Sequence, residues 1–414
     1  MAETSRQGIS KMRLGAASAA LALAILLMLG VVTTQSAQAQ TFTVLHNFFG
    51  SPKDGGGLYA GLVQDAAGNL YGTTEYGGAG PGTLFKVSQA GKESLSFKFT
   101  GTRTGTHPYA QLIRDAAGNL YGTTYFGGDL SCGFHGNACG TVFKLSKTGK
   151  ETVLYKFTGG TTDGCNPQGG LVRDKAGNLY GTTYGCGAAG LGTVFKLDTA
   201  GKETVLHNFS GEPTDGANPQ FTSLLLDVKG NLYGVTPIGG SVNNCNYGCG
   251  TLYKLSRSGT WTVLHNFAGF PTDGCTPYGT PALDKNSNVY GSTFRGGSGS
   301  GSVGTVWKVS QNGTESVLHN FPADGSEGCN IYAGVIMDAT GNLYGDTSAC
   351  GTHYGAGTVY ELSKAGTLTV LHTFTISDGQ TPSGNLIRDA KGDLYGTTYQ
   401  GGNGGNGTVW KLTP

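Results

Sequence analysis

Short apolar segments alternate with glycine-bearing polar turns along almost the whole chain. Representative segments are LYGTT (120–124), TVFKL (141–145) and TVLYKF (152–157), which are rich in β-branched and aromatic residues. Such residues, in short runs bounded by turn residues, are typical of strands. Beyond residue 40, apolar positions do not recur at helical spacing. The pattern therefore predicts an all-β protein made of many short strands.

The same segments recur seven times in the same order. DAAGNLYGTT occupies 65–74 and again 115–124, and related versions follow at intervals of 50 to 59 residues. A GTVFKL-type segment and then a TVLHNF-type segment follow each of them. The tyrosines of the repeated NLYG motif are Tyr71, Tyr121, Tyr180, Tyr233, Tyr290, Tyr344 and Tyr395. Three motifs that stay in phase indicate tandem structural units.

Each unit reads as four strands, which is typical of a β-propeller blade. The series of repeats begins with a lone fourth-strand segment (43–48) and ends with a lone third-strand segment (407–412). Pairing between them would complete the last blade and remove two free sheet edges. We therefore expect a seven-bladed β-propeller with four-stranded blades, closed by the N-terminal strand.

The connections between strands fall into two groups. The first-to-second turn is short, as in DAAGN, where Asp65 can accept hydrogen bonds from backbone amides and Gly68 can adopt positive φ. The third-to-fourth turn is also short. The second-to-third loops and the inter-blade loops vary in length and belong to the opposite rim. We expect function on this long-loop face, because binding residues often lie on loops held by a rigid scaffold.

The first forty residues differ from the rest. An apolar run (14–32) follows Arg6, Lys11 and Arg13, and Ala37-Gln38-Ala39 is a signal-peptidase pattern. We expect residues 1–39 to be a cleaved signal peptide and 40–414 to be the propeller, secreted or periplasmic, without stable membrane insertion. The alternative is an uncleaved anchor, because the run is close to the ~20 residues that span a bilayer.

Composition narrows the choice of partner. Charged residues make up 13% of the chain and the formal net charge is +1. A basic field that would attract phosphate backbones is therefore missing, and we expect no nucleic-acid partner. We expect a monomer.

Nine cysteines all fall in the predicted long loops. Their spacing predicts four disulfides that leave Cys275 unpaired: Cys132–Cys139, Cys165–Cys186, Cys245–Cys249 and Cys329–Cys350. The alternative for Cys245 and Cys249 is a metal site. Export favours disulfides, and no companion ligand pair follows closely, so we expect no metal there.

Two sets of polar residues recur around the ring. Five histidines share a fourth-strand position, which favours a structural role: His46, His207, His265, His319 and His372. Asp-Gly pairs recur in the inter-blade loops, at Asp54, Asp163, Asp215, Asp273, Asp324 and Asp378. Asp-Gly is turn chemistry. The alternative is that these carboxylates bind hydroxyl-rich ligands or a cation such as Ca²⁺; we expect no other cofactor.

Departures from the repeat are the other candidates. Asp346, Glu75 and Arg295 are acid–base or electrostatic candidates for catalysis, and His107, His135 and His353 lie in long loops. Four tyrosines end second strands and could stack on sugars: Tyr76, Tyr125, Tyr184 and Tyr399. The alternative in each case is tolerated variation in surface loops. No nucleophile elbow, zinc-protease motif or phosphate loop is present.

The repeated unit DaaGNLYGTTyxGG…GtvFKL…GkEtvLhnF…DG resembles the GloVer-type tandem repeat of exported bacterial proteins. That resemblance spans the mature chain and implies a propeller-like fold outside the cytoplasm. The DxxGNLY turn is also similar, more distantly, to the turn of NHL and SMP-30-type propellers. Some SMP-30-like members are metal-dependent lactonases with acidic and amide ligands in the central channel, but no such ligand set matches positions here.

Two hypotheses about function follow. The first is an exported, non-catalytic binding or interaction protein that engages a glycan or another extracytoplasmic protein through its long-loop face. The second is a metal-dependent hydrolase, lactonase or lyase with its site in the central channel, where Asp346 or Glu75 would serve in acid–base catalysis.

Overall fold

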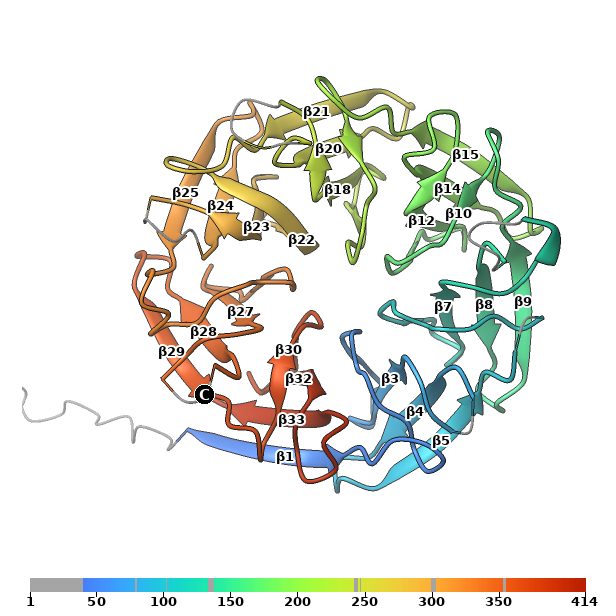
Figure 1. Ribbon diagram of the computed structural model, residues 1–414, viewed down its shortest axis with the longest axis horizontal. Helices are drawn as coiled ribbons and strands as arrows, with labels where there is room; N and C mark the ends of the chain where they lie inside the picture. The colour runs from blue at the N-terminus through green and yellow to red at the C-terminus, as the bar shows by residue number, and fades with distance from the viewer. Residues whose placement is uncertain are drawn as a thin grey trace, which may run out of the picture. The chain divides into compact units, whose positions relative to one another are not determined.

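The computed structural model describes residues 40–78, 80–101, 103–132, 138–241, 245, 247–298, 303–352 and 355–414. The chain divides into two units between Gln40 and Thr41. The expected signal peptide (1–39) lies outside the described residues, as do His135 and His353. From Thr41 to Pro414, seven antiparallel sheets form a ring, so the protein is a seven-bladed β-propeller (Figure 1).

The strands are short. Within each blade they are given in order from the innermost strand to the outermost. Blades 1 to 3 are β2 (Val63–Gln64), β3 (Leu70–Thr74), β4 (Thr83–Val87) and β5 (Glu93–Lys98); β6 (Ile113–Arg114), β7 (Leu120–Thr124), β8 (Thr141–Leu145) and β9 (Glu151–Lys156); β11 (Val172–Arg173), β12 (Leu179–Thr183), β14 (Thr193–Leu197) and β15 (Glu203–Asn208). Blades 4 to 6 are β17 (Leu225–Leu226), β18 (Leu232–Thr236), β20 (Thr251–Leu255) and β21 (Trp261–Asn266); β22 (Gly274–Leu283), β23 (Val289–Gly296), β24 (Thr305–Val309) and β25 (Glu315–Asn320); β26 (Ile336–Met337), β27 (Leu343–Thr347), β28 (Thr358–Leu362) and β29 (Leu368–Thr373).

Blade 7 contains both ends of the propeller chain. It is made of β30 (Gln380–Pro382), β31 (Ile387–Arg388), β32 (Leu394–Gln400), β33 (Thr408–Thr413) and β1 (Thr41–Asn47). Two short ladders lie in the long loops, β10 (Gly164–Cys165) with β13 (Gly185–Cys186) and β16 (Gly216–Ala217) with β19 (Ile238–Gly239), together with a 3₁₀ turn, Leu130–Cys132.

The N-terminal strand closes the ring. β1 runs antiparallel to β33, with Thr41 opposite Thr413 and Asn47 opposite Thr408. In Figure 1 the blue β1 lies along the red β33. The Phe48 amide continues the ladder by donating to the Gly407 carbonyl at 3.0 Å. The predicted closure is therefore confirmed.

The repeated turn has the predicted chemistry. The Asp65 carboxylate accepts hydrogen bonds from the Asn69 amide at 2.9 Å and from the Tyr71 hydroxyl at 3.0 Å. Gly68 has a φ of 80°, which side chains rarely tolerate. The Lys86 ammonium lies 5.7 Å from the Tyr71 ring centre on the adjacent strand. These local contacts repeat around the ring, which explains why the same letters recur.

The hydrophobic core lies between neighbouring blades. One cluster joins blades 7 and 1, and in it Phe48, Phe85 and Val409 are all fully buried. The second and third strands of each blade are also joined by a buried threonine pair, such as Thr74 and Thr83, whose hydroxyl oxygens lie 2.7 Å apart. Apolar burial at the blade interfaces provides most of the driving force for closing the ring.

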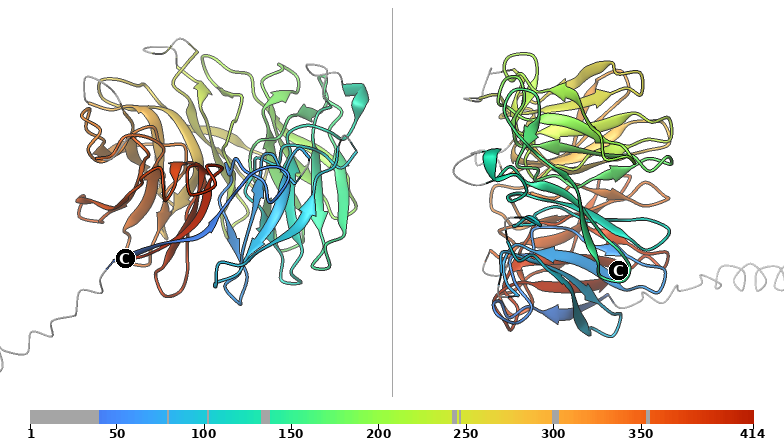
Figure 2. Two further views of the ribbon diagram at one scale, coloured as in Figure 1. Left: turned by 60° about the horizontal axis from the view of Figure 1, so that its bottom comes forward. Right: turned by 90° about the vertical axis from the view of Figure 1, so that its right-hand side faces the viewer.

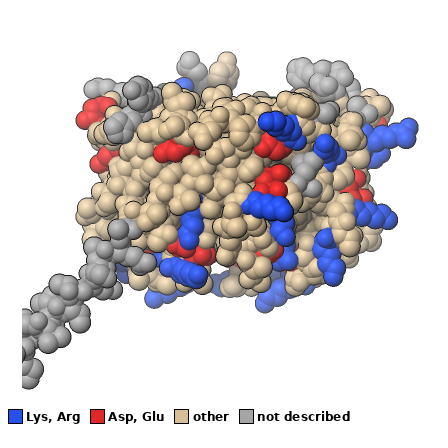
Figure 3. All heavy atoms as spheres, turned by 90° about the horizontal axis from the view of Figure 1, so that it is seen from below, with Lys and Arg blue, Asp and Glu red and all other residues tan. Residues whose placement is uncertain are grey.

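The two rims differ as predicted. Figure 2 (left) shows the blades from the side, with hairpin turns along the lower edge and longer loops along the upper edge. Acidic and basic side chains are interspersed on the side surface of Figure 3, so that face carries no field of a single sign. Among the described residues, no helix has the length and apolar character needed to cross a membrane.

Candidate functional site

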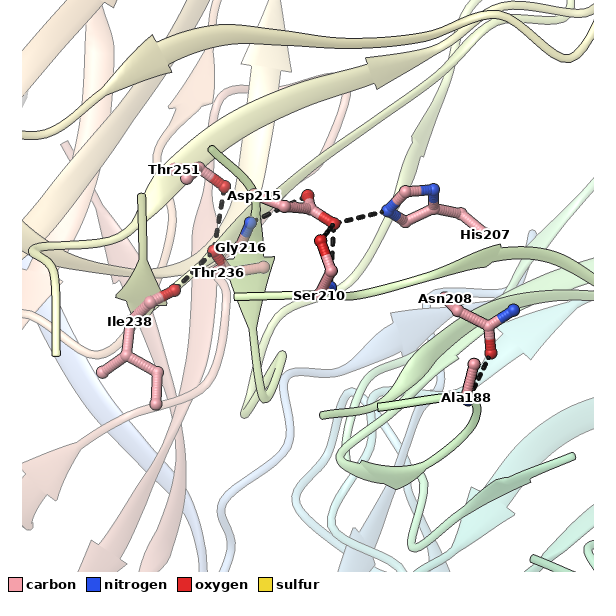
Figure 4. Close-up of polar contacts among 9 residues, drawn as sticks. All are labelled: Ala188, His207, Asn208, Ser210, Asp215, Gly216, Thr236, Ile238 and Thr251. Atoms are coloured by element: carbon pink, nitrogen blue, oxygen red, sulfur yellow. Dashed lines mark hydrogen bonds and ion pairs between the residues drawn. The ribbon is translucent and has the colours of Figure 1, made fainter. Parts of the chain in front are cut away.

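The Asp-Gly carboxylates form structural links at the blade junctions. In Figure 4, Asp215 Oδ2 lies 2.8 Å from His207 Nε2 and accepts a hydrogen bond from the Ser210 amide at 3.0 Å. The Gly216 amide donates to Oδ1 at 2.8 Å. Burial opposes the charged form of Asp215, but these hydrogen bonds outweigh it and lower the pKa of the carboxyl. The link ties the outer strand of blade 3 to the following inter-blade loop.

Equivalent links occur at other junctions. The pairs are His46–Asp54, His265–Asp273 and His372–Asp378, while Asp163 accepts a hydrogen bond from Tyr155 instead. At the junction between blades 5 and 6 the carboxylate is that of Glu327, which lies 2.7 Å from His319. Asp324 lies three residues earlier, in an exposed turn, where its carboxylate accepts from Ser326. Each of these carboxylates serves its own junction, and they do not gather around one ligand.

Three clusters of described residues have metal-ligand chemistry, and none lies in the channel. Two consist of cysteines, most of which are disulfide-bonded. The third is His265, Asp273 and Glu315 on the outer strands of blades 4 and 5 and the loop between them. Burial and the nearby charge of Asp273 raise the pKa of Glu315 to about 7. This group is a further inter-blade contact of the kind just described.

The cysteines pair as the spacing predicts. The disulfides are Cys132–Cys139, Cys165–Cys186, Cys245–Cys249 and Cys329–Cys350. Cys275 is free, and its sulfur lies 3.4 Å from Cys245 Sγ. Burial raises the pKa of the Cys275 thiol, so the thiol form is favoured at neutral pH.

Two catalytic candidates, Asp346 and Arg295, line none of four cavities that the described residues form. Asp346 is 0% exposed within β27, and neither of its carboxyl oxygens has a hydrogen-bond partner. Burial raises its pKa well above the usual value and so favours the neutral acid. Arg295 is exposed at the end of β23, with its guanidinium 5.3 Å from the centre of the Phe294 ring. These two residues and Glu75 do not form a common site.

A cavity of about 320 Å³ lies on the propeller axis, and we call it the channel cavity. All seven blades contribute to its lining, mainly through the segment that leads from each inter-blade loop into the first strand. Tyr399 and Gln400, at the end of β32, complete the wall. The cavity therefore belongs to the long-loop side of the channel.

Asn385 forms the floor of the channel cavity. Its Nδ2 donates to Thr280 Oγ1 at 2.9 Å and to Gln111 Oε1 at 3.3 Å, and its Oδ1 accepts from the Gly334 amide at 2.8 Å. One side chain of blade 7 thus contacts blades 2, 5 and 6. Glycines allow the close approach: a Cβ at Gly384 would lie 2.5 Å from the backbone nitrogen of Gly61. A second cavity, of about 450 Å³, begins beyond this floor on the short-turn side.

Aromatic rings form much of the wall. The Tyr59 ring centre lies 4.3 Å from that of Tyr399 and 5.5 Å from those of Tyr109 and Phe221. Tyr332 adds a further ring to the lining. Because these residues come from blades 1, 2, 4, 6 and 7, the rings converge on the axis from almost the whole circumference.

Phe221 reaches the axis through an unusual local conformation. The segment from Asp215 to Asp227 is one residue longer than the corresponding segment from Asp163 to Asp174. Phe221 has a φ of 51°, a left-handed conformation that is a genuine outlier for a bulky residue. Strain of this kind tends to occur at functional sites. Here it places the Phe221 ring against Tyr59, which belongs to a distant blade.

Glu75 supports the aromatic wall. Its Oε1 accepts a hydrogen bond from the Tyr109 hydroxyl at 3.0 Å, and its Oε2 accepts one from the Tyr399 hydroxyl at 3.3 Å. Burial and the carboxylate raise the pKa of Tyr109, so this phenol stays a proton donor. Burial lowers the pKa of His107, which lies beside Tyr109, and favours neutral imidazole.

Two polar atoms in the lining have unused hydrogen-bonding capacity. Gln168 is 6% exposed, and its Oε1 has no hydrogen-bond partner. Ser383 Oγ is likewise buried and without a partner. Both residues line the channel cavity. Since buried polar atoms in proteins are normally satisfied, these two are suited to bind a ligand.

The sequence identified part of this site. Tyr399 lines the cavity, and Tyr125 packs against Tyr109 with ring centres 5.4 Å apart. Tyr76 is exposed and donates to Asn406, and the Tyr184 carbonyl accepts from Asn218. The residues missed were Tyr59, Tyr109, Phe221, Tyr332, Gln168, Ser383 and Asn385. The sequence did contain one indication of this site. Tyr59, Tyr278 and Tyr332 each lie five residues after the carboxylate residue of a blade junction.

Comparison with solved structures finds propellers of similar fold. The extracellular domain described as part of the hybrid two-component system BT3049 from B. thetaiotaomicron has a TM-score of 0.55 and 14% identity, over 90% of this chain and 41% of that chain. That of BT4673 has a TM-score of 0.53 and 11% identity, over 89% and 39%. This chain thus spans about two fifths of those proteins, and the likeness is one of fold.

A gluconolactonase from Xanthomonas campestris matches with a TM-score of 0.41 and 16% identity, over 72% of this chain and 82% of that chain. A match at this level does not support a shared activity. Comparison with curated protein sequences finds no match.

Residues 28–172, 132–280 and 241–414 match the model of the Gloeobacter/Verrucomicrobia repeat, which covers most of the sequence. The chain therefore belongs to the Gloeobacter/Verrucomicrobia repeat family.

Proposed function

We propose that this protein is an extracytoplasmic binding propeller that holds a small hydroxyl-rich ligand, such as the terminal sugar of a glycan, in the channel cavity. The observation that carries this proposal is a cavity with aromatic walls, the Asn385 amide at its floor and two unpartnered buried polar atoms, Gln168 Oε1 and Ser383 Oγ. A volume of about 320 Å³ is at the small end of the range for ligand sites.

The chemistry of the lining suits a sugar. Aromatic faces such as Tyr59 pack against the apolar C–H faces of a pyranose ring. Gln168 Oε1 accepts from a hydroxyl, and Ser383 Oγ can donate or accept. The Asn385 side chain lies between the two cavities, where it contacts blades 2, 5 and 6, so we expect the channel cavity to take the end of a chain and not its middle.

The cysteine chemistry supports a location outside the cytoplasm. Four disulfides form most readily in an oxidising compartment. The extracellular domains that share the propeller fold agree with this location.

Hydrolysis or lactonase chemistry has less support. The described lining of the channel cavity contains no carboxylate and no imidazole. Glu75 contacts the wall from behind through two tyrosine hydroxyls. A single supporting carboxylate offers neither a metal-ligand set nor an acid–base pair.

Glycan-array screening of residues 40–414, followed by calorimetry with the best ligand, tests the proposal. We expect Tyr59→Ala to weaken binding on the order of tenfold, since a packed aromatic ring contributes about 0.5–1.5 kcal/mol beyond the area that it buries. Tyr247→Ala removes a tyrosine that is 76% exposed on a distant loop, and it should leave binding unchanged. Tyr59→Phe retains the stacking face and controls for folding. Equal binding by Tyr59→Ala and the wild type would contradict the proposal, as would chelator-sensitive turnover of a lactone or glycoside.

A further inference from the structure

One negatively charged side chain, Glu75, is hydrogen-bonded to the wall of the channel cavity. None of the described lining residues carries a formal charge. Glu75, directly behind the wall, is bonded to Tyr109 and Tyr399. None of the ion pairs among the described residues includes Glu75. The site therefore has one negative group and no basic side chain in its lining.

The hydrogen bonds to Glu75 also affect the aromatic faces. A phenol that donates its proton to a carboxylate has a more electron-rich ring than a free phenol. Tyrosine faces attract cations through the ring quadrupole, and the attraction is stronger where water is displaced. Tyr109 and Tyr399 both make this hydrogen bond, and both line the cavity together with Tyr59. The tyrosine rings and the Glu75 carboxylate thus both favour a positively charged ligand.

From this juxtaposition we propose that the channel cavity selects a ligand carrying a positive charge, namely an amino sugar or another hydroxyl-bearing amine, over its neutral and acidic counterparts. This inference rests on the proposed function and adds the ligand's charge to it. The amine lies against the tyrosine faces beside Glu75, and the hydroxyls contact Gln168 Oε1 and Ser383 Oγ.

A carboxylate-bearing sugar is disfavoured for the same reason. The described lining offers no lysine or arginine to compensate an acidic group. Glu75 and the faces of the tyrosines would both repel it. A uronic acid should therefore bind more weakly than the neutral sugar of the same shape.

Calorimetry with four probes, at about pH 6 where an amine is charged, tests the inference: glucosamine, glucose, glucuronate and choline. We expect glucosamine to bind on the order of tenfold more tightly than glucose, a factor that cation–π and charge attraction can supply. Glucuronate should bind most weakly. Glu75→Gln should reduce the preference for glucosamine over glucose while glucose binding persists. Glu212→Gln changes an exposed loop glutamate and should preserve the preference.

The outcomes separate the two proposals. Equal affinity for glucosamine and glucose overturns the charge inference and leaves the sugar-binding proposal in place. Binding of choline with no sugar bound supports the charge inference and overturns the hydroxyl-rich ligand. A glucosamine preference that survives Glu75→Gln shows that Glu75 is not its source. Failure of all four probes at millimolar concentration contradicts both proposals.

Discussion

Asp346 occupies a position that five of the other six blades fill with a hydroxyl side chain and that Val235 fills in blade 4. Ser292 Oγ donates to the Ala333 carbonyl at 2.6 Å, and Thr397 Oγ1 donates to the Ala60 carbonyl at 2.9 Å, in each case reaching the neighbouring blade. The carboxyl of Asp346 is enclosed at the same position without a partner. A charge there would be unpaired in the interior, so the neutral acid is the stable form.

Asp346 should make stability depend on pH. Burial raises its pKa in the folded state above the unfolded value, so between the two values only the unfolded chain is ionised and it binds fewer protons. Stability therefore falls as pH rises through this window, by at most about 1.4 kcal/mol per pH unit. We expect Asp346→Thr to exceed the wild type in urea resistance at neutral pH, with a smaller difference at about pH 4.

Urea unfolding across this pH range measures the effect. Asp324→Asn is a suitable control because Asp324 lies in an exposed turn, and it should not reproduce the gain. A loss of stability in Asp346→Thr at neutral pH would mean that the carboxyl makes a favourable interaction that the hydroxyl cannot replace.

At the scale of elements, the long loops are held by covalent links. The Cys165–Cys186 bond joins β10 to β13, where Gly164 is paired with Cys186. Cys329–Cys350 has the same sequence separation of 21 residues in blade 6. Both bonds connect the loop that enters a blade to the second-to-third loop of that blade. They add covalent links to the backbone hydrogen bonds that already hold these loops.

Thiol counting tests these links. Protein unfolded without reductant should show one reactive thiol, and reduction should expose all nine cysteines. In the folded state Cys275 should react slowly, because it is partly buried and burial raises its pKa. Cys275→Ser should remove the single thiol. Nine thiols before reduction would contradict both the disulfides and the proposed compartment.

At the scale of the whole molecule, stability depends on closure. β1 covers the β33 edge from Thr41 to Asn47 and brings Phe42 against Trp410, with ring centres 5.7 Å apart. Phe48 is fully buried between blades 7 and 1. Without this strand, blade 7 would have an unpaired edge, and such edges promote association.

A chain that starts at Phe49 should therefore be much less stable than one that starts at Gln40. We expect a lower thermal midpoint and concentration-dependent association, measured by calorimetry and light scattering. Addition of a peptide with the sequence of residues 41–48 should partly restore the midpoint, because it can pair with β33 as an intermolecular strand. Unchanged stability of the shorter chain would show that blade 7 does not need β1.

The parts of the fold that the sequence predicted depend on neighbouring residues. Asp65, Gly68 and Asn69 form one turn within five residues, so their contacts follow from local spacing. The Asp-Gly spacing was misleading only in blade 6. In blade 6 the residue that contacts the fourth-strand histidine is Glu327. Its separation in sequence from Asp338 equals that between Asp54 and Asp65, whereas Asp324 lies three residues too early.

The seven-fold repeat, its strands and its turns were determined by the sequence itself, because each arises from contacts between residues close in the chain that recur in every blade. The closure was also determined by the sequence, because β1 carries the fourth-strand motif that the last repeat lacks. The cavity was decided by the tertiary structure alone. Tyr59, Phe221 and Asn385 lie more than a hundred residues apart in the chain and meet only because the ring brings every blade to one axis. Side chains from all seven blades fill one shared space at the axis, so the residue at a given position can differ from blade to blade. A motif that is common to all blades therefore does not identify these residues.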